Sequence, residues 1–394
     1  MKRQRRTKII ATIGPSSCQP AQLERLVTAG ADVFRINMSH SSHEDMRTYV
    51  AALRKLENKL GPIAILADLQ GPKLRISSLA EGQVRIEKGQ RIVFDANHAP
   101  GTKDRVGLLH PEIYAAAEPG HTLLIDDGKL NLRIVEVQPG RMIVEVVTGG
   151  ILSSRKGVNL PDAILPLGSM TLKDREDCEA AIKASVDWIA ISFVQRAQDV
   201  LDVKAIVQDR AAVMAKIERR AAIVAIEHIL NESDGIMVAR GDLGVELPLE
   251  QVPGLQKQIL TAARDRGKPV VVATQMLESM TASPVPTRAE VSDVATAVFE
   301  GADAVMLSAE SATGAYPIEA VATMDRVARQ VEVLGVGEDR LDDLLRIALL
   351  AQDRRAVLRM LVERRVHLVV EVVKKSRNAP ELLVAAELAR VRGG

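Results

Sequence analysis

The chain has 394 residues, of which 47% are hydrophobic and 26% charged, a composition that excludes disordered, collagen-like and low-complexity proteins. Because 52 Lys and Arg face 51 Asp and Glu, the net charge is only +1, so nucleic acid and anionic membranes are not expected as partners. The two cysteines argue against a disulfide framework and against a Cys-based zinc site.

The N-terminal segment Lys2–Lys8 is basic, and the apolar run behind it stops at Gly14 and Pro15. That run is too short for the hydrophobic region of a signal peptide, and no stretch reaches the roughly 18 consecutive apolar residues of a membrane span. We therefore expect a cytoplasmic protein whose basic start is a solvated tail.

Short β-branched runs alternate along the chain with longer stretches of helical periodicity. Strands are predicted over residues 8–14, 32–39, 63–70, 188–194, 213–218, 235–241, 269–275 and 303–310. Helices are predicted over residues 20–30, 43–61, 173–186, 196–210, 252–267, 289–301 and 317–332. Eight strand-then-helix units predict an α/β fold, a closed (β/α)₈ TIM barrel rather than an open sheet.

One connection interrupts this alternation. Residues 74–159 show no good helical period but contain alternating segments separated by Gly, Pro and Asp turns, which predicts a β-rich lid domain inserted after the third strand. The barrel would then comprise residues 1–73 and 160–334. Residues 335–394 are charged and mainly helical in pattern, and we interpret them as a short C-terminal appendage.

Polar residues gather at the ends of six predicted strands, where the active site of a barrel lies. They are Arg35, Asn37 and Ser39; Asp68 and Gln70; Lys216 and Glu218; Asp242; Thr274; and Ser308 and Glu310. Taken singly, each has a structural explanation as an interior ion pair, a helix cap or a hydrogen-bonded core group. Their convergence from six strands is what indicates a site.

Glu218 and Asp242 follow adjacent strands, and two carboxylates with substrate oxygens and water are how Mg²⁺ is usually held. Lys216 adds a cation suited to a transferring phosphoryl group, and the Gly241 amide can meet an anionic oxygen. His40 and His43 lack a third ligand for zinc. Residue chemistry therefore predicts a Mg²⁺-dependent barrel enzyme acting on a small phosphorylated anion, without identifying that anion.

Long segments resemble the pyruvate kinases, in the same order along the chain. They are TKIIATIGPSS, FRINMSHSSHEDM, DLQGPKLR, RKGVNLP, AKIE, SDGIMVARGDLGVELP, ATQMLESM, PTRAEVSDVATAV and DAVMLSAESATGAYP. The resemblance covers residues 7–330 and implies transfer of the phosphoryl group of phosphoenolpyruvate to ADP, giving pyruvate and ATP, with Mg²⁺ or Mn²⁺ as cofactor.

The resemblance also implies roles for individual residues. Lys216 resembles the catalytic lysine, Arg35 the arginine on the phosphoryl group, and Glu218 and Asp242 the metal ligands. Gly241 and Thr274 match positions that hold the substrate carboxylate, beside Asp242. Thr274, Ser308 and Glu310 are similar to the relay that protonates the enolate carbon, and the nucleotide side corresponds to Asn37, His40, Arg75 and Lys156.

Counterparts of Asn37, Ser39, Asp68 and the Leu69 carbonyl bind potassium in many members, which carry Glu where this chain has Lys73. Since a tethered ammonium can replace a free cation, the resemblance implies that this chain does not require potassium. The loop after Glu218 reads RRAA, where the family commonly has an Asn-x-Glu-Gly pattern.

The C-terminal region departs further from the family. Residues 335–394 do not match its effector domain, which also carries a subunit contact. The expected assembly is therefore a homo-oligomer, a dimer formed through the barrel in preference to the family's usual tetramer. Two other interpretations remain open at this point: a non-catalytic relative, and a barrel enzyme that uses phosphoenolpyruvate for carbon–carbon chemistry.

Overall fold

The computed structural model describes residues 3–336, with only the backbone at the last two. The chain divides into Met1–Arg329, to which the description below applies, and Gln330–Gly394. Apart from its first two residues, the predicted appendage 335–394 lies outside the described residues. The last described elements are helix α12 (Pro317–Val331) and a π-helical turn, η3 (Glu332–Val336).

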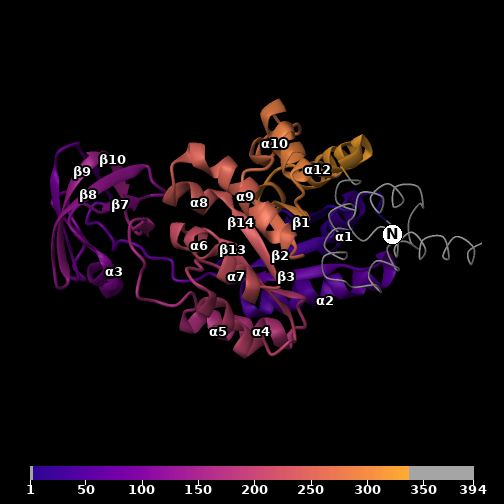
Figure 1. The fold of residues 1–394 in the computed structure, drawn as a ribbon, viewed down its shortest axis with the longest axis horizontal. Helices are drawn as coiled ribbons and strands as arrows, with labels where there is room; N and C mark the ends of the chain where they lie inside the picture. The colour runs from indigo at the N-terminus through magenta and orange to yellow at the C-terminus, as the bar shows by residue number, and fades with distance from the viewer. Residues whose placement is uncertain (1–2, 337–394) are drawn as a thin grey trace, which may run out of the picture. The chain divides into compact units, whose positions relative to one another are not determined.

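Eight parallel strands close into a barrel in the order β1-β16-β15-β14-β13-β12-β3-β2 (Figure 1). They are β1 (Lys8–Thr12), β2 (Val33–Asn37), β3 (Ala64–Asp68), β12 (Trp188–Ile191), β13 (Ala212–Ile217), β14 (Gly235–Ala239), β15 (Val270–Ala273) and β16 (Ala304–Leu307). The predicted TIM barrel is confirmed, and each predicted strand is present, mostly in shortened form. Arg240, Gly241 and Glu310 were predicted within strands but belong to helices that start directly after β14 and β16.

Helices connect the strands along the outside of the barrel. They are α1 (Pro20–Ala29), α2 (His43–Leu60), α4 (Leu172–Lys183), α5 (Ala197–Val207), α6 (Arg220–Val224), α7 (Ile226–Glu232), α8 (Arg240–Glu246), α9 (Val252–Asp265), α10 (Arg288–Phe299) and α11 (Ala309–Ala312), with the 3₁₀ turns η1 (Leu249–Gln251) and η2 (Glu278–Thr281). The sequence predicts none of α6, α7, α8 and α11, because helices of two turns or fewer leave too short a pattern to recognise.

Reciprocal caps fix where several helices begin. Thr171 accepts a hydrogen bond from the Asp174 amide at the start of α4, and the Asp174 carboxylate binds back to the Thr171 amide. The same arrangement joins Ser42 to Asp45 at α2. Each cap satisfies backbone donors that a helix N-terminus leaves free, which typically contributes about 1 kcal/mol.

A second group of strands is inserted between β3 and β12. It contains β4 (Gln83–Ile86), β5 (Arg91–Asp95), β6 (Arg105–Gly107), β7 (Thr122–Ile125), β8 (Leu130–Gln138), β9 (Arg141–Thr148), β10 (Gly150–Ser153) and β11 (Val158–Asn159). They form a two-stranded sheet, β10-β4, and a six-stranded sheet, β11-β7-β8-β9-β5-β6. The segment was expected to lack helices, yet it contains α3 (Pro111–Ala116), whose six residues are too few to show a period.

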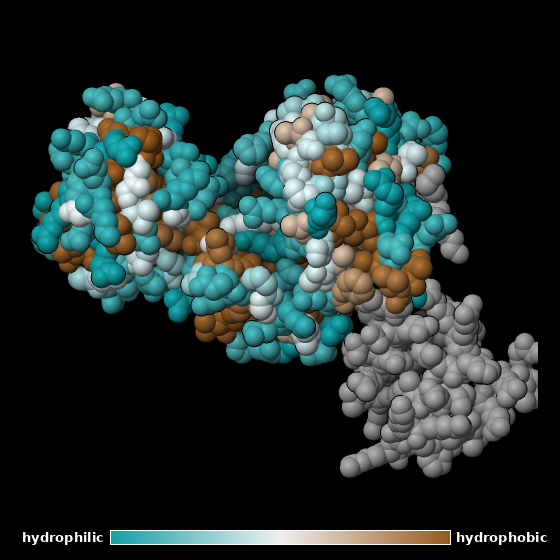
Figure 2. Space-filling view, turned by 90° about the horizontal axis from the view of Figure 1, so that it is seen from above, coloured by the Kyte–Doolittle hydropathy of each residue, from teal (hydrophilic) through white to brown (hydrophobic). Residues whose placement is uncertain are grey.

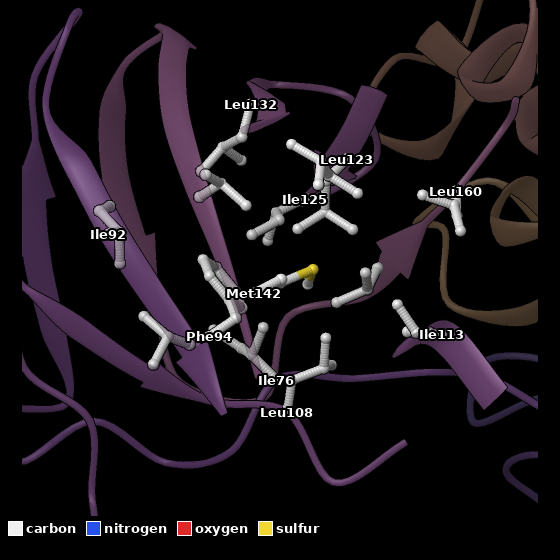
Figure 3. Packing of buried hydrophobic residues seen from close by; sticks show 14 of the residues in the cluster. Ile76, Ile92, Phe94, Leu108, Ile113, Leu123, Ile125, Leu132, Met142 and Leu160 are labelled. Carbon is white, nitrogen blue, oxygen red and sulfur yellow. The ribbon is translucent and has the colours of Figure 1, made fainter. Parts of the chain in front are cut away.

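The inserted strands have their own hydrophobic core (Figure 3). Ile92 and Phe94 alternate with more exposed neighbours on β5, as a strand with one buried face requires. Met142 and Leu123 reach the same core from β9 and β7, and it extends to Leu165. The packing therefore continues past the predicted boundary at residue 159, and the lid function of this domain stays a prediction.

The interior of the barrel is filled by an apolar layer rather than by a pore. Its members are Ile10, Leu66, Ala190, Met214, Met237, Val271, Ala273, Ala304 and Met306. Unbranched methionine side chains can fill such an irregular space. This layer supports the polar residues that come next along the strands.

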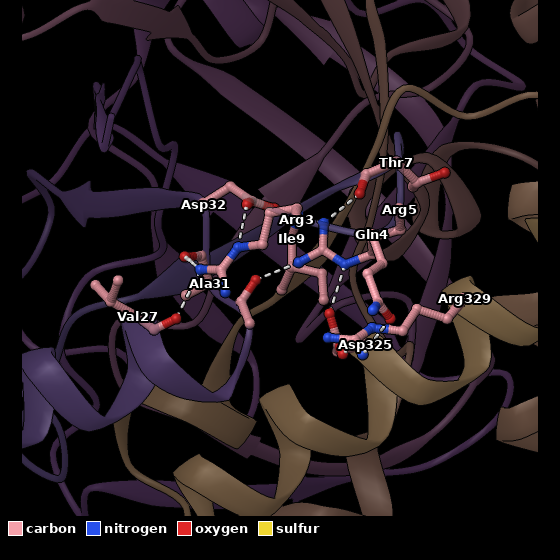
Figure 4. A network of polar contacts seen from close by, with 11 residues as sticks. Arg3, Gln4, Arg5, Thr7, Ile9, Val27, Ala31, Asp32, Asp325 and Arg329 are labelled. Atoms are coloured by element: carbon pink, nitrogen blue, oxygen red, sulfur yellow. Dashed lines mark hydrogen bonds and ion pairs between the residues drawn. The ribbon is translucent and has the colours of Figure 1, made fainter. Parts of the chain in front are cut away.

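The basic N-terminus packs against the barrel, so the prediction of a solvated tail is wrong (Figure 4). The Arg5 side chain is fully buried and pairs with Asp32 at 2.6 Å and Asp325 at 2.8 Å. It also donates to the carbonyls of Thr7 and Gly30. Because both carboxylates are distant in the sequence, composition alone could not indicate that this arginine is paired.

The surface in Figure 2 is largely hydrophilic with hydrophobic residues interspersed. The most exposed large apolar side chains include Val224 and Leu172, and scattered residues of this kind are normal on globular proteins. Within residues 3–336, none of the helices combines the length and apolar character needed to cross a bilayer.

Candidate active site

The polar cluster of the barrel follows from the two-residue period of its strands. Lys216 lies two residues beyond Met214, and Asp68 lies two residues beyond Leu66, both of which belong to the apolar layer. Side chains two apart share one face of a strand. The polar groups are therefore stacked on the apolar layer, toward the C-terminal ends of the strands.

The ammonium of Lys216 is the centre of this cluster. Its Nζ lies 2.9 Å from Glu218 Oε1 and 3.2 Å from Asp68 Oδ1, and it donates to Ser192 Oγ at 2.8 Å. Burial alone would lower the pKa of Lys216, but the charges of Asp68 and Glu218 outweigh burial and raise the pKa above its ordinary value. The amine is therefore a fixed cation at neutral pH.

Asp68 joins Lys216 to Arg35. The Arg35 Nε donates to Asp68 Oδ2 at 2.7 Å, and a second guanidinium nitrogen donates to Thr12 Oγ1 at 3.1 Å. Burial would raise the pKa of Asp68, yet the charges of Lys216 and Arg35 prevail and lower it. One buried carboxylate thus holds two cations at the C-terminal end of the barrel.

Glu218 and Asp242 are the two carboxylates that the sequence predicts as metal ligands. Glu218 Oε2 accepts a hydrogen bond from the Phe193 amide at 2.7 Å, whereas the buried Oε1 accepts no aligned hydrogen bond. Burial, followed by the negative charge of Glu218, raises the pKa of Asp242 to about 6. The charge of Glu218 thus acts on Asp242, and two carboxylates that repel each other favour a bound hard cation. Glu218 Oε1 is paired with the Lys216 ammonium at 2.9 Å.

Among residues 3–336, no group of three or more His, Cys, Asp or Glu side chains is placed to hold a metal ion. A cation bound here would depend on two carboxylates, with water and, when it is bound, substrate supplying its other ligands. Mg²⁺ commonly binds in that way.

Thr274 and Gly241 are in direct contact. The Gly241 amide donates to Thr274 Oγ1 at 2.7 Å, and the backbone of Thr274 has a φ of 74°. A positive φ is rare for a β-branched residue and marks a strained site that its surroundings must hold. Arg240 helps to hold it by donating to the Thr274 carbonyl at 2.6 Å.

Ser308 and Glu310 follow β16, and the Glu310 side chain binds the backbone amide of Ser308. Glu310 Oε2 accepts from the Ser308 amide at 2.7 Å, and Oε1 accepts from the Leu277 amide at 3.2 Å. Burial raises the pKa of Glu310, against these hydrogen bonds. Glu310 therefore ties together the loops after β15 and β16.

The predicted nucleotide-side residues lie in two places. Asn37 ends β2 and accepts from the Ser39 amide at 3.1 Å, while His40 is exposed on the next turn. Arg75 and Lys156 belong to facing segments at the base of the inserted domain, where Lys156 pairs with Asp126 at 2.8 Å. In the described part of the chain, no hydrogen bond or ion pair joins these two groups.

The predicted monovalent-cation site is only partly assembled. Asn37 and Asp68 are register partners on β2 and β3, and the Leu69 carbonyl accepts from Ser192 Oγ at 2.9 Å. Within residues 3–336 the ammonium of Lys73 forms no ion pair with Asp68. Its charge instead opposes the rise in the pKa of Asp242 that burial and Glu218 cause.

Three residues of the site, Ser192, Phe193 and Arg219, make contacts that were not predicted from the sequence. Ser192 bridges Lys216 and Leu69, and Phe193 binds Glu218 through its amide. Arg219 lies over the Phe193 ring, with 5.1 Å from its guanidinium carbon to the ring centroid. Ser192 could have been found from its position two residues beyond Ala190 on β12, but stacking on Phe193 leaves no local sequence signal.

The barrel and the polar cluster at its C-terminal strand ends are those of a TIM-barrel enzyme. The family model of the pyruvate kinase barrel domain matches residues 4–321. A pyruvate kinase of Methylorubrum extorquens is 60% identical over 84% of this chain and 70% of its own length. One from Agrobacterium vitis is 52% identical over 84% of this chain and 69% of its own.

A crystal structure of a pyruvate kinase from Cryptosporidium parvum superposes with a TM-score of 0.82 at 36% identity, covering 84% of this chain and 70% of that one. The chain therefore belongs to the pyruvate kinase family, which consists of phosphotransferases.

Proposed function

We propose that this chain transfers the phosphoryl group of phosphoenolpyruvate to ADP, giving pyruvate and ATP, with Mg²⁺ or Mn²⁺ bound by Glu218 and Asp242. The observation that carries the proposal is the buried Lys216 ammonium, 2.9 Å from Glu218 and 3.2 Å from Asp68. A fixed cation beside two carboxylates is suited to bringing two phosphate-bearing anions together.

The residues of the chain divide the chemistry among them. Lys216 stabilises the charge that develops on the phosphoryl group in transit, and Arg35, held by Asp68, contacts the same group. The bound divalent cation would polarise the substrate oxygens and offset their charge. Because Asp68 and Ser192 hold the ammonium in place before substrate arrives, little reorganisation is needed during transfer.

Thr274 acts at the other end of the substrate. Its Oγ1 accepts from the Gly241 amide, and in the described residues its own hydroxyl proton has no acceptor. That proton is available to the enolate carbon left after transfer, with Ser308 and Glu310 as the relay behind it. Asn37, His40, Arg75 and Lys156 would hold the nucleotide.

Further parts of the proposal concern conditions and assembly. Lys73 takes the place of a free monovalent cation, so turnover does not need potassium. The inserted domain, residues 74–159, acts as a lid over the barrel formed by residues 1–73 and 160–334. We further expect a homo-oligomer, dimer or tetramer, in the cytoplasm.

A lactate dehydrogenase-coupled assay with phosphoenolpyruvate, ADP and Mg²⁺ tests the activity directly. Lys216→Met should lower kcat by about a hundredfold to a thousandfold, the range for a lost electrostatic contact of this type, while Lys183→Met, whose side chain is 80% exposed, should not. Pyruvate formation without ADP-dependent ATP formation would contradict the proposal. So would a Lys216→Met variant that keeps most of the wild-type rate.

A further inference from the structure

Arg219 is a buried arginine directly after the proposed metal ligand Glu218. The whole residue is only 4% exposed, and its guanidinium carbon lies 5.1 Å from the centroid of the Phe193 ring. At that distance a guanidinium over an aromatic face is attracted by the ring, more strongly where water is excluded. A long charged side chain is rarely buried without such partners.

Phe193 connects this arginine to Glu218. Its amide donates to Glu218 Oε2 at 2.7 Å, and its backbone has a φ of 58°. An aromatic residue seldom adopts this left-handed conformation, which persists only where the surroundings hold it. Without it, the amide would no longer be aimed at Glu218.

Arg219 also contacts the carboxylate of Glu246. A guanidinium nitrogen of Arg219 lies 3.8 Å from Glu246 Oε1, and the side chains are only 5% and 3% exposed. The same oxygen accepts from Asn159 Nδ2 at 2.8 Å. Because Asn159 lies on β11 and Glu246 on α8, Arg219 is fixed by elements that are independent of the loop carrying Phe193.

Gly71 completes the packing around the ring. A Cβ added at Gly71 would lie 2.7 Å from Phe193 Cδ2, closer than real side chains approach. The ring therefore occupies a closely bounded space between the loop after β3 and Arg219. Small changes on either neighbour should move it.

We infer that Arg219 is a positioning residue for the metal ligand Glu218, acting through the stacked Phe193 ring and the Phe193 amide. Arg219 does not touch substrate or metal in this arrangement. It keeps Phe193 in the left-handed conformation that lets its amide fix Glu218 Oε2. Oε1, which pairs with the Lys216 ammonium at 2.9 Å, is thereby held at the proposed cation site. The inference rests on the proposed function in taking Glu218 as a ligand of a divalent cation.

The test measures Mn²⁺ binding by electron paramagnetic resonance on the full chain, without substrate. Arg219→Met keeps most of the side-chain volume, and we expect its Mn²⁺ dissociation constant to rise about tenfold, as for other groups that orient a metal ligand. Arg219→Lys keeps the charge but not the planar stack, so it should lose affinity similarly. Arg220→Met is the control, since the Arg220 side chain is 59% exposed and should leave affinity unchanged.

Thermal unfolding of the same samples separates positioning from folding. A purely structural role would lower Tm but leave Mn²⁺ affinity of the folded variants unchanged, and that result overturns the inference. If Arg219→Met does not fold, Phe193→Leu decides: it keeps the amide, removes the ring, and should also weaken Mn²⁺ binding about tenfold. Unchanged affinity there overturns the inference, whereas absence of Mn²⁺ binding by the wild type overturns the proposed metal site itself.

Discussion

The amide of Gly241, in the first turn of α8, donates a hydrogen bond across 2.7 Å to Thr274 Oγ1 at the end of β15. Two neighbouring barrel strands are thereby linked at the point where substrate is proposed to bind. The bond also orients the threonine hydroxyl, because with Oγ1 accepting from the amide its own proton points elsewhere. Two consequences can be measured.

Thr274→Val removes the hydroxyl at nearly constant volume. We expect kcat to fall at least about a hundredfold, the lower range for loss of a proton-transfer group, and stability to fall by about 1–3 kcal/mol because the Gly241 amide loses its acceptor. Deuterium exchange into pyruvate, followed by NMR, isolates the proton-transfer step. Thr274→Ser keeps the hydroxyl and should retain exchange, whereas normal exchange in Thr274→Val would exclude Thr274 as the donor.

The raised pKa of Asp242 predicts that the stability of the metal-free chain depends on pH. This pKa is raised from 3.8 to about 6 in the folded state, by burial and then by Glu218. The folded chain therefore binds this proton more tightly than the unfolded chain, so stability falls as pH rises from about 4 to about 6, by at most about 3 kcal/mol. Above that range the cost is fully present.

Asp242→Asn removes this cost. In urea unfolding without divalent cations, the variant should be more stable than wild type at pH 8, and the difference should vanish near pH 4. The exposed Asp104→Asn serves as control and should show no such change. If the stability difference between Asp242→Asn and wild type is equal at both pH values, folding does not raise the pKa of Asp242.

We predict that substitution of Arg5 lowers stability strongly and leaves catalysis unchanged. The fully buried Arg5 side chain pairs with Asp32 and Asp325. Arg5→Met would leave only Arg3 as a partner of Asp32 and only Arg329 as a partner of Asp325, so we expect a loss of about 3 kcal/mol, the lower end for a broken buried pair. Arg5 precedes β1, so it lies at the end of the barrel opposite the strand ends that carry the site. We expect a lower urea midpoint and an unchanged kcat at a temperature where the variant is folded.

Arg329→Met is the matched control for that experiment. Arg329 pairs with the same Asp325 at 2.7 Å, but its side chain is 42% exposed, and pairs of this kind contribute about 0–1 kcal/mol. Equal destabilisation by the two variants would show that burial of Arg5 is not what makes its pairing strong.

The sequence was most informative where a feature repeats locally. The eight barrel strands were found because runs of β-branched residues are short-range patterns, and Lys216 and Asp68 could be assigned to one face from their two-residue spacing. Arg5 could not be assigned, since its partners lie 27 and 320 residues away. The contact between Phe193 and Arg219 is likewise tertiary. Phe193 adopts a left-handed backbone conformation without being a glycine, so the sequence gives no sign of that conformation.

The presence of Lys73 leads to a prediction about how kcat responds to monovalent cations. The positive charge of Lys73 opposes the rise in the pKa of Asp242 that burial and Glu218 cause, so the ammonium is close enough to the proposed metal site to act on its charge. A cation attached to the chain is present at any salt concentration. Replacing potassium by tetramethylammonium should therefore lower kcat by less than about tenfold, or about 1.4 kcal/mol.

Lys73→Glu should convert the enzyme to one that potassium activates, because the site then has one positive charge fewer and one negative charge more. The readout is the coupled assay over a potassium titration, and Lys103→Glu, an exposed substitution in the inserted domain, should leave the response flat. If wild-type activity itself collapses without potassium, Lys73 does not replace the ion. If Lys73→Glu stays indifferent to potassium, the ammonium has no part in the electrostatics of transfer.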